Sequence, residues 1–243
     1  MKLRIRHTKL GKVRFTSHRD SARHWERAVR KAGVSLAYSG GFTPRPRMSF
    51  GLALPTGAES LAEYLDIELA PGVEADLDDL ATRFDAALPV GYEVTHVVPR
   101  DAGSASLQED VVACSWAIAL AGVGTDDLSS AITTTMAATT LLVDRERKGQ
   151  RSTDDVRPAI LDLSATSVAD DPRPHLCAML ATTGRGLRPL ELVAALFPAL
   201  DPVDTAARVL RTQQWIERDG VRREVIPAEQ VATRTALTEV TCA

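Results

Sequence analysis

A histidine at position 18 stands among side chains that can act on a phosphate. Ser17, Arg19 and Asp20 surround it, and imidazole is the group best suited to exchange a proton near neutral pH. As a general acid or base beside a phosphate clamp, His18 would make the chain a metal-independent ribonuclease. The alternative is that His18 only binds a phosphate or a backbone carbonyl. Because single histidines near arginines are common in sites that do no chemistry, we assign His18 to binding and name no catalytic residue.

Basic side chains recur around His18 with the spacing of regular structure. One set follows every fourth residue of a predicted helix and is called the basic stripe: Arg19, Arg23, Arg27 and Lys31. A second set alternates with apolar residues along predicted strands: Arg4, Arg6, Lys12 and Arg14. Such residues contact phosphates and give affinity for nucleic acid of any sequence. The alternative is a solvated face that balances acidic residues elsewhere.

Two loops add candidates for the same role. Segment 38–47 contains two glycines and two prolines, and it carries aromatic and basic side chains: Tyr38, Phe42, Arg45 and Arg47. Aromatic rings stack on unpaired bases, and prolines preset the backbone, so a phosphate or a flipped nucleotide fits there; the alternative is a crossover loop. A charged hairpin tip in the second half offers another basic set: Arg147, Lys148 and Arg151. RNA is favoured over duplex DNA because no helix-turn-helix or zinc finger is present.

Composition narrows the class of protein. The chain has 243 residues, of which 44% are hydrophobic and 25% charged, as in soluble globular proteins. No apolar run approaches the roughly 20 residues of a membrane helix, and the basic start lacks the apolar core of a secretory signal. We therefore expect a cytoplasmic protein without a membrane partner. The three cysteines form no CxxC pair, so we predict neither a metal site nor a cofactor.

Charge is distributed unevenly along the chain. Residues 1–50 contain 13 Lys and Arg against 2 Asp and Glu, a balance of +11, whereas the remaining residues contain 16 against 30, a balance of −14. A field of this polarity attracts polyanions to one end of the protein and repels them from the rest. The N-terminal part is therefore the predicted binding region.

The first hundred residues predict alternating strands and helices. Apolar alternation indicates a strand over 2–8 and 12–16, bent at Gly11, and helical spacing indicates a helix over 17–33 with Ser17 as its N-cap. The remaining pattern predicts a hairpin of strands 48–54 and 62–69, a helix over 75–88 and a strand over 91–98. This βαββαβ order predicts a ferredoxin-like domain over residues 1–100.

The second half predicts another, decorated ferredoxin-like α+β domain over residues 111–216. A polar segment, 99–110, is predicted as the linker. Strands are expected at 112–121, 141–147, 156–164 and 174–182, and helices at 125–139, 188–199 and 202–216. Residues 217–243 are predicted to be a polar C-terminal tail. The fold class is therefore α+β.

The most specific motifs lie in the first 65 residues: Arg4-x-Arg6-x-Thr8-Lys9-x-Gly11, Arg14-Phe15-x-Ser17-His18-x-Asp20, Tyr38-Ser39-x-Gly41-Phe42-x-Pro44-x-Pro46 and Pro55-x-Gly57-x-x-Ser60-x-x-Glu63-Tyr64. Two more occur in the second half, Arg145-x-x-Lys148-Gly149 and Asp155-x-Arg157-Pro158. Together these motifs resemble the radical SAM-linked family, bacterial proteins or domains that occur beside, or fused behind, cobalamin-binding radical SAM proteins. Where the family often has histidine between the two prolines, this chain has Arg45, which can replace a histidine that contacts phosphate but not one that does chemistry.

The resemblance implies an accessory role with RNA and a radical SAM protein as partner. The chain has no CxxxCxxC motif, so it cannot hold the cluster of such an enzyme itself. The leading hypothesis is a non-catalytic protein that presents rRNA or tRNA to a radical SAM modification enzyme. One alternative is a metal-independent endoribonuclease similar to the CRISPR repeat-processing ribonucleases, with His18 as general acid or base. Another is a protein adaptor that binds no RNA.

Overall fold

The computed structural model describes residues 1–100, 103–147, 149–184 and 186–226. The chain divides into two compact units. Unit 1 is Met1–Val111 together with the described residues from Ile216 onward, and unit 2 is Val112–Trp215. Both units combine helices with mostly antiparallel strands, so the α+β class is confirmed, while the ferredoxin-like detail stays a prediction.

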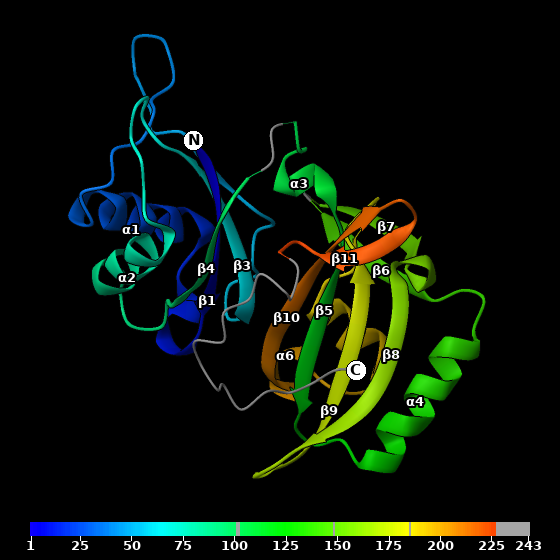
Figure 1. The fold of residues 1–243 in the computed structure, drawn as a ribbon. Coiled ribbons are helices and arrows are strands. Elements are labelled where there is room, and N and C mark those ends of the chain that lie inside the picture. The colour runs from blue at the N-terminus through cyan, green and yellow to red at the C-terminus, as the bar shows by residue number, and fades with distance from the viewer. Residues whose placement is uncertain (101–102, 148, 185, 227–243) are drawn as a thin grey trace. The chain divides into compact units, whose positions relative to one another are not determined.

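Unit 1 has the element order that the hydrophobic pattern predicted. Its elements in chain order are β1 (Lys2–Lys9), a 3-10 helix (Gly11–Phe15), α1 (His18–Lys31), β2 (Met48–Phe50), β3 (Glu59–Glu68), α2 (Leu77–Ala87), β4 (Val94–Pro99) and α3 (Leu107–Asp110). β1 pairs antiparallel with both β3 and β4, and β2 pairs antiparallel with the far edge of β3. Figure 1 shows α1 and α2 side by side against these strands.

The core of unit 1 explains why these segments fold as they do. Leu3 and Ile5 from β1, Leu65 from β3, and Trp25 and Phe84 from the two helices are fully buried in one apolar cluster. The apolar residues of the strands alternate and those of the helices follow helical spacing, so each element buries one face. This packing holds α1 against β1 and β3, where the candidate site lies.

Unit 2 contains longer strands. Its elements are β5 (Val111–Leu120), α4 (Thr125–Ala137), β6 (Leu142–Arg147), β7 (Gln150–Asp155), a 3-10 helix (Arg157–Ala159), β8 (Ile160–Val168), β9 (Asp171–Ala181), α5 (Pro189–Leu196), α6 (Pro202–Thr205) and β10 (Ala206–Arg218). The strands follow the order β10-β5-β9-β8, and β6 and β7 form a separate hairpin. From Ile216 onward β10 belongs to unit 1, as does β11 (Val221–Glu224), which pairs with it.

Two predicted elements are wrong in type. Residues 12–16 were expected in a strand, but Gly11 has a φ of +66° and begins a 3-10 helix instead. Its backbone N–H donates to Glu59 Oε1 at 2.7 Å, which fixes this turn against β3. Residues 206–216 were expected in a helix but lie in β10. Alanine, leucine, arginine and glutamine favour helices, and here the pairing with β5 outweighs that preference.

Other boundaries also differ from the prediction. Residues 150–155 form β7, and the strand expected at 156–164 begins at Ile160. In the predicted linker, residues 107–110 form α3 with Leu107 buried. Residues 217–226 continue β10 and form β11 rather than a tail, while 227–243 lie outside the described residues. In the described ranges, no helix is long and apolar enough to cross a membrane.

Candidate functional site

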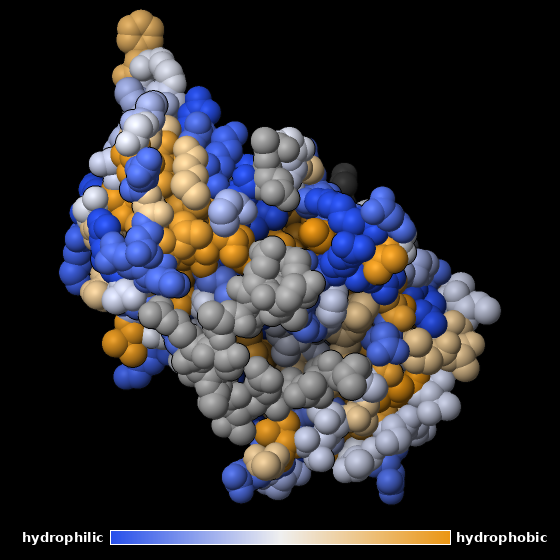
Figure 2. All heavy atoms as spheres, viewed as in Figure 1, coloured by the Kyte–Doolittle hydropathy of each residue, from blue (hydrophilic) through white to orange (hydrophobic). Residues whose placement is uncertain are grey.

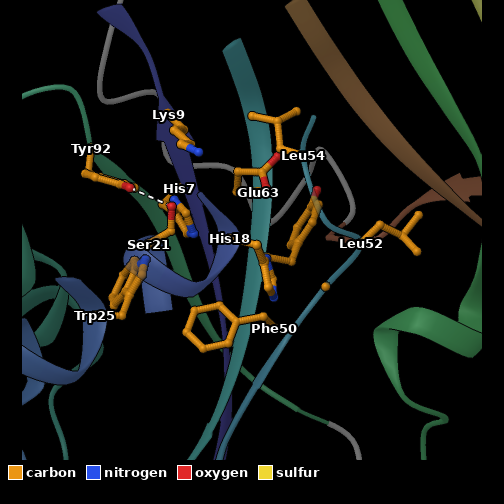
Figure 3. A pocket seen from close by; sticks show the side chains of 12 residues that line it. His7, Lys9, His18, Ser21, Trp25, Phe50, Leu52, Leu54, Glu63 and Tyr92 are labelled. Atoms are coloured by element: carbon orange, nitrogen blue, oxygen red, sulfur yellow. Dashed lines mark hydrogen bonds between the residues drawn. The ribbon is translucent and has the colours of Figure 1, made fainter. Parts of the chain in front are cut away.

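A cavity in unit 1 brings polar side chains from α1, β1 and β3 together (Figure 3). Its empty volume, including the part open to solvent, is about 380 Å³. Its lining includes His7, Lys9, His18, Trp25, Phe50 and Glu63. His18 and Trp25 lie seven positions apart on α1, so both point from one helix face toward the strands. The cavity therefore follows from packing α1 against the sheet.

Polar groups of this cavity are buried to an unusual degree. Lys9 is 3% exposed and its ammonium group donates to the Thr16 carbonyl at 2.8 Å. His7 is 4% exposed, and its Nδ1 lies 3.1 Å from the Thr8 carbonyl, so this nitrogen carries a proton. Trp25 is 0% exposed, and its Nε1 has no hydrogen-bond partner in the part of the chain that the structure describes. The cavity thus holds a buried cation and a buried, unsatisfied donor.

A hydroxyl network closes one side of the cavity. The Tyr92 hydroxyl donates to Ser21 Oγ at 2.9 Å, as the dashed line in Figure 3 marks. Thr16 Oγ1 donates to the Val13 carbonyl at 2.7 Å and lies 3.2 Å from Ser21 Oγ. Because the Thr16 proton is used by Val13, Ser21 is the donor between them. Each hydroxyl of the network thus donates a hydrogen bond, and the network holds the first turns of α1 against the loop before β4.

His18 lies at the start of α1, where the cap orders the chain. Ser17 Oγ accepts from the Asp20 backbone N–H at 3.1 Å and donates to the Asp20 carboxylate at 2.8 Å. The bond from Ser17 lowers the pKa of Asp20, and Arg23 acts in the same direction. The ring of His18 meets Phe50 edge-on, with 5.6 Å between centroids. The sequence predicted this cap, and the structure adds the contact with Phe50.

The basic stripe of α1 is exposed along its length. Arg23 pairs with Asp20 one turn earlier at 3.1 Å, and Lys31 donates to the Ala86 carbonyl at 3.1 Å. Arg19 and Arg27 are exposed. Burial and the neighbouring Arg27 lower the pKa of His24, which keeps that ring neutral beside the stripe. The stripe is therefore a surface on which phosphates can replace water.

The loop before β2 is a hairpin with aromatic rings exposed to solvent. Ser39 and Arg45 face each other through a backbone bond of 2.9 Å and a bond of 3.0 Å to the Ser39 hydroxyl. Tyr38 is 59% exposed and Phe42 fully exposed. Figure 2 shows a hydrophobic side chain at this loop tip, clear of the surrounding surface. Arg45 is exposed, whereas Arg47 pairs with Glu68 at 3.2 Å.

The strand arginines do not form the exposed face that alternation predicted. Arg4 is 7% exposed, and its guanidinium makes two bonds to the Asp66 carboxylate at 2.8 and 3.0 Å. The expectation that Arg4 is a surface contact is therefore wrong. Arg6 is half-buried. Lys12 is exposed on the 3-10 helix, and Arg14 there pairs with Glu59 at 3.5 Å.

The basic hairpin of unit 2 is only partly described. Lys148 lies outside the described residues, as does the side chain of Arg147, whose backbone ends β6. Arg151 is exposed on β7. Arg145, at the base of this hairpin, pairs with Glu191 at 2.9 Å and with Asp154 at 3.6 Å. Its role is to hold the hairpin within unit 2.

Sequence reasoning missed the deep residues of the cavity. Trp25 lies within the predicted helix over 17–33 and His7 within the predicted strand over 2–8, but neither is among the predicted site residues. Lys9 and Glu63 entered only through motifs. One signal could have found His7 and Lys9. Both are polar, and both continue the alternation of Leu3 and Ile5, which places them on the buried face of the strand. In the described ranges, no group of three or more His, Cys, Asp or Glu stands close enough to hold a metal ion.

Comparisons with known proteins give a family and a distant structural neighbour. A family model described as "Uncharacterized protein conserved in bacteria (DUF2344)" matches residues 2–189. No curated protein matches the chain. A chain from the "Crystal Structure of a Cbf5-Nop10-Gar1 Complex" is similar in structure with a TM-score of 0.45 and 8% sequence identity. The similarity covers 87% of this chain and 48% of that one, so the chain spans about half the length of this structural neighbour.

Proposed function

The chain belongs to the DUF2344 family of conserved bacterial proteins, and we propose that it binds RNA through unit 1 as a non-catalytic accessory protein. The observation that carries the proposal is the basic stripe, which unit 1 presents to solvent over the length of α1. Guanidinium groups in this arrangement neutralise successive phosphates and release their counterions. The exposed rings of Tyr38 and Phe42 add surfaces on which unpaired bases stack.

The proposed partner is a radical SAM protein, to which unit 1 presents rRNA or tRNA. This part of the proposal rests on the resemblance of the motifs in the first 65 residues. Crosslinking the protein to RNA in cells with ultraviolet light, followed by sequencing of the RNA and mass spectrometry of the proteins that co-purify, identifies both partners. Recovery of neither RNA nor a radical SAM protein would contradict the proposal.

A salt titration of RNA affinity tests the stripe directly. Replacing Arg19, Arg23 and Arg27 with Gln lowers the affinity and reduces the slope of log affinity against log salt by about 0.7 for each lost contact with single-stranded RNA. Arg188→Gln is the matched control, because Arg188 is an exposed arginine of unit 2 and no part of the stripe. An unchanged slope in the triple variant would show that the stripe is solvated surface and makes no contact with RNA. If no RNA binds at all, the adaptor without RNA binding is favoured.

One observation favours a second function, a metal-independent endoribonuclease. The cavity combines His18 with His7, Lys9 and Glu63, which are the types of group that exchange protons with a reacting hydroxyl and stabilise a phosphorane. Incubating the protein with its crosslinked RNA in EDTA tests this alternative. Cleavage that disappears in His18→Ala while affinity persists would replace the accessory function with the ribonuclease.

A further inference from the structure

The unsatisfied N–H of Trp25 is the feature of the cavity that calls for a ligand. Leaving a buried donor without an acceptor costs about 1–3 kcal/mol, and native proteins rarely do so. The Trp25 ring is fixed by a tilted ring contact with His7 at 4.8 Å and an edge contact with Phe84 at 5.5 Å between centroids. The N–H therefore keeps its direction into the cavity, where a bound acceptor can reach it.

The shape of the cavity limits what that acceptor can be. Only about 20 Å³ has room for the centre of a water molecule, which corresponds to about one water position. A single carbonyl oxygen or ring nitrogen fits this space. A phosphate, with four oxygens around one atom, is too large for this inner space beside Trp25. The group that reaches Trp25 thus belongs to a flat ligand whose edge enters first.

The remaining lining suits the edge and faces of such a ligand. Figure 3 shows Lys9 and Glu63 from neighbouring strands turned toward the same space, one a donor and the other an acceptor. Phe50 and His18 contact each other in the lining, His18 exposed to solvent and Phe50 half-buried, and Leu52 and Leu54 add apolar lining. Aromatic rings of this kind stack on the face of a planar ring.

We propose that the Watson–Crick edge of one unpaired nucleobase of the bound RNA enters this cavity, while the ring of the base stays in its open part. Each base carries a hydrogen-bond acceptor beside a donor on its Watson–Crick edge. The acceptor takes the Trp25 N–H, the donor faces the Glu63 carboxylate, and the ring stacks against Phe50 or His18. Pockets that read a base in this way combine edge hydrogen bonds with aromatic or apolar walls. The inference rests on the proposed RNA binding and adds that the RNA offers an unstacked base to unit 1.

Nitrogen-15 NMR of the indole N–H signals tests the cavity in the full chain. Trp25→Phe assigns the Trp25 signal, because that signal disappears from the spectrum. Uridine, cytidine, adenosine and guanosine 5′-monophosphates are then titrated separately, with inorganic phosphate at the same concentrations as the control. We expect at least one nucleotide to move the Trp25 signal in a saturable way and phosphate to leave it in place. An equal response to phosphate, or no response to any nucleotide, would overturn the proposal.

Affinities for single-stranded and duplex RNA separate this inference from the proposed function. Bases in a duplex are paired, so only single strands can fill the cavity. Trp25→Phe removes one hydrogen bond to the base and should weaken single-strand binding about five- to tenfold while leaving duplex binding unchanged. Leu80→Val perturbs the same core without touching the cavity lining and should change neither affinity. If Trp25→Phe weakens single-strand and duplex binding equally, Trp25 only stabilises the core and contacts no base.

The stripe variants complete the separation. The triple variant of Arg19, Arg23 and Arg27 binds both single-stranded and duplex RNA more weakly, because phosphate contacts do not depend on unpaired bases. If that variant responds as expected but the Trp25 signal never moves, RNA binding stands and the base pocket fails. If the Trp25 signal moves with nucleotides but no RNA binds, the pocket is a nucleotide site and the proposed function fails.

Discussion

Helices α1 and α4 show how differently the two units use charge. The helices have 14 and 13 residues, and each follows a long first strand. α1 exposes the basic stripe, whereas α4 contains no Lys or Arg and begins with Asp126 and Asp127. In unit 2, two arginines are paired with carboxylates elsewhere in the unit: Arg145 with Glu191, and Arg173 with Asp171 at 2.7 Å. The helix that follows the first strand thus carries an exposed basic surface in unit 1 and none in unit 2.

The largest expected effect compares two glycines. Gly91 in unit 1 has a φ of +104°, and a Cβ there would stand 2.5 Å from the Leu10 carbonyl oxygen. Gly122 in unit 2 has a φ of +72° with no atom that close. Gly91→Ala should lower the free energy of unfolding by about 3–5 kcal/mol, because backbone strain adds to the clash, and Gly122→Ala by about 1–2 kcal/mol. Urea denaturation measures both, and equal losses would contradict the close approach at Gly91.

The second prediction compares a paired arginine with an exposed one. The guanidinium of Arg157 donates to the carbonyls of Met136 and Ala138 at the end of α4, and to that of Ile160. Arg157→Ala should cost about 2–3 kcal/mol of stability, because these carbonyls lose a charged donor. Arg27→Ala should stay within about 0.5 kcal/mol and lower RNA affinity instead. Thermal unfolding measures the loss of stability in each variant, and RNA titration measures the loss of affinity. A stability loss in Arg27→Ala, or an affinity loss in Arg157→Ala, would contradict the contrast between the units.

Local sequence patterns predicted unit 1 better than unit 2. Apolar alternation and helical spacing located β1, α1, α2 and β4 because each buries one face in a shared core. In β10, residues 206–216 favour a helix locally, and only pairing with β5 makes them a strand. Such pairing joins segments far apart in sequence, so no local pattern contains it.

The candidate site was predictable only on its surface. Helical spacing correctly placed Arg19 and Arg27 on an exposed face. Arg4 looked equivalent, but its exposure depended on whether Asp66, on a strand 62 positions later, would face it. The cavity depended on the same kind of information, since Trp25, Lys9 and Glu63 meet only when α1 packs across β1 and β3.

The third prediction concerns one buried histidine in each unit. His96 on β4 has a buried Nε2 without a hydrogen-bond partner in the described part of the chain, whereas Nε2 of His175 on β9 lies 3.4 Å from Asp171. Burial lowers the pKa of His96 from its usual value of 6.5 to about 4. Between these values the unfolded chain binds a proton that the folded chain does not, so stability falls as pH drops from 6.5 to 4.

Linkage alone gives about 3 kcal/mol for this difference in pKa at pH 4, and screening by solvent around the partly buried ring reduces the expected loss from His96 to about 1–2 kcal/mol. Urea denaturation at several pH values measures it, and His96→Gln should flatten this part of the profile because glutamine does not titrate. A profile that keeps its full slope in His96→Gln would assign the pH dependence to other groups.

The smallest expected effect compares the N-caps of α1 and α4. Ser17 accepts the Asp20 N–H at the start of α1, whereas α4 begins after Gly124 without a side-chain cap. Ser17→Ala should cost about 1 kcal/mol of stability, and Ser17→Gly only a few tenths, because glycine leaves the N–H open to water. The change also frees the Asp20 carboxylate, whose pKa rises toward its usual value when the Ser17 bond is lost. Proton NMR titration of Asp20 measures that rise, and an unchanged pKa in Ser17→Ala would show that Arg23, rather than the cap, holds this carboxylate ionised beside His18.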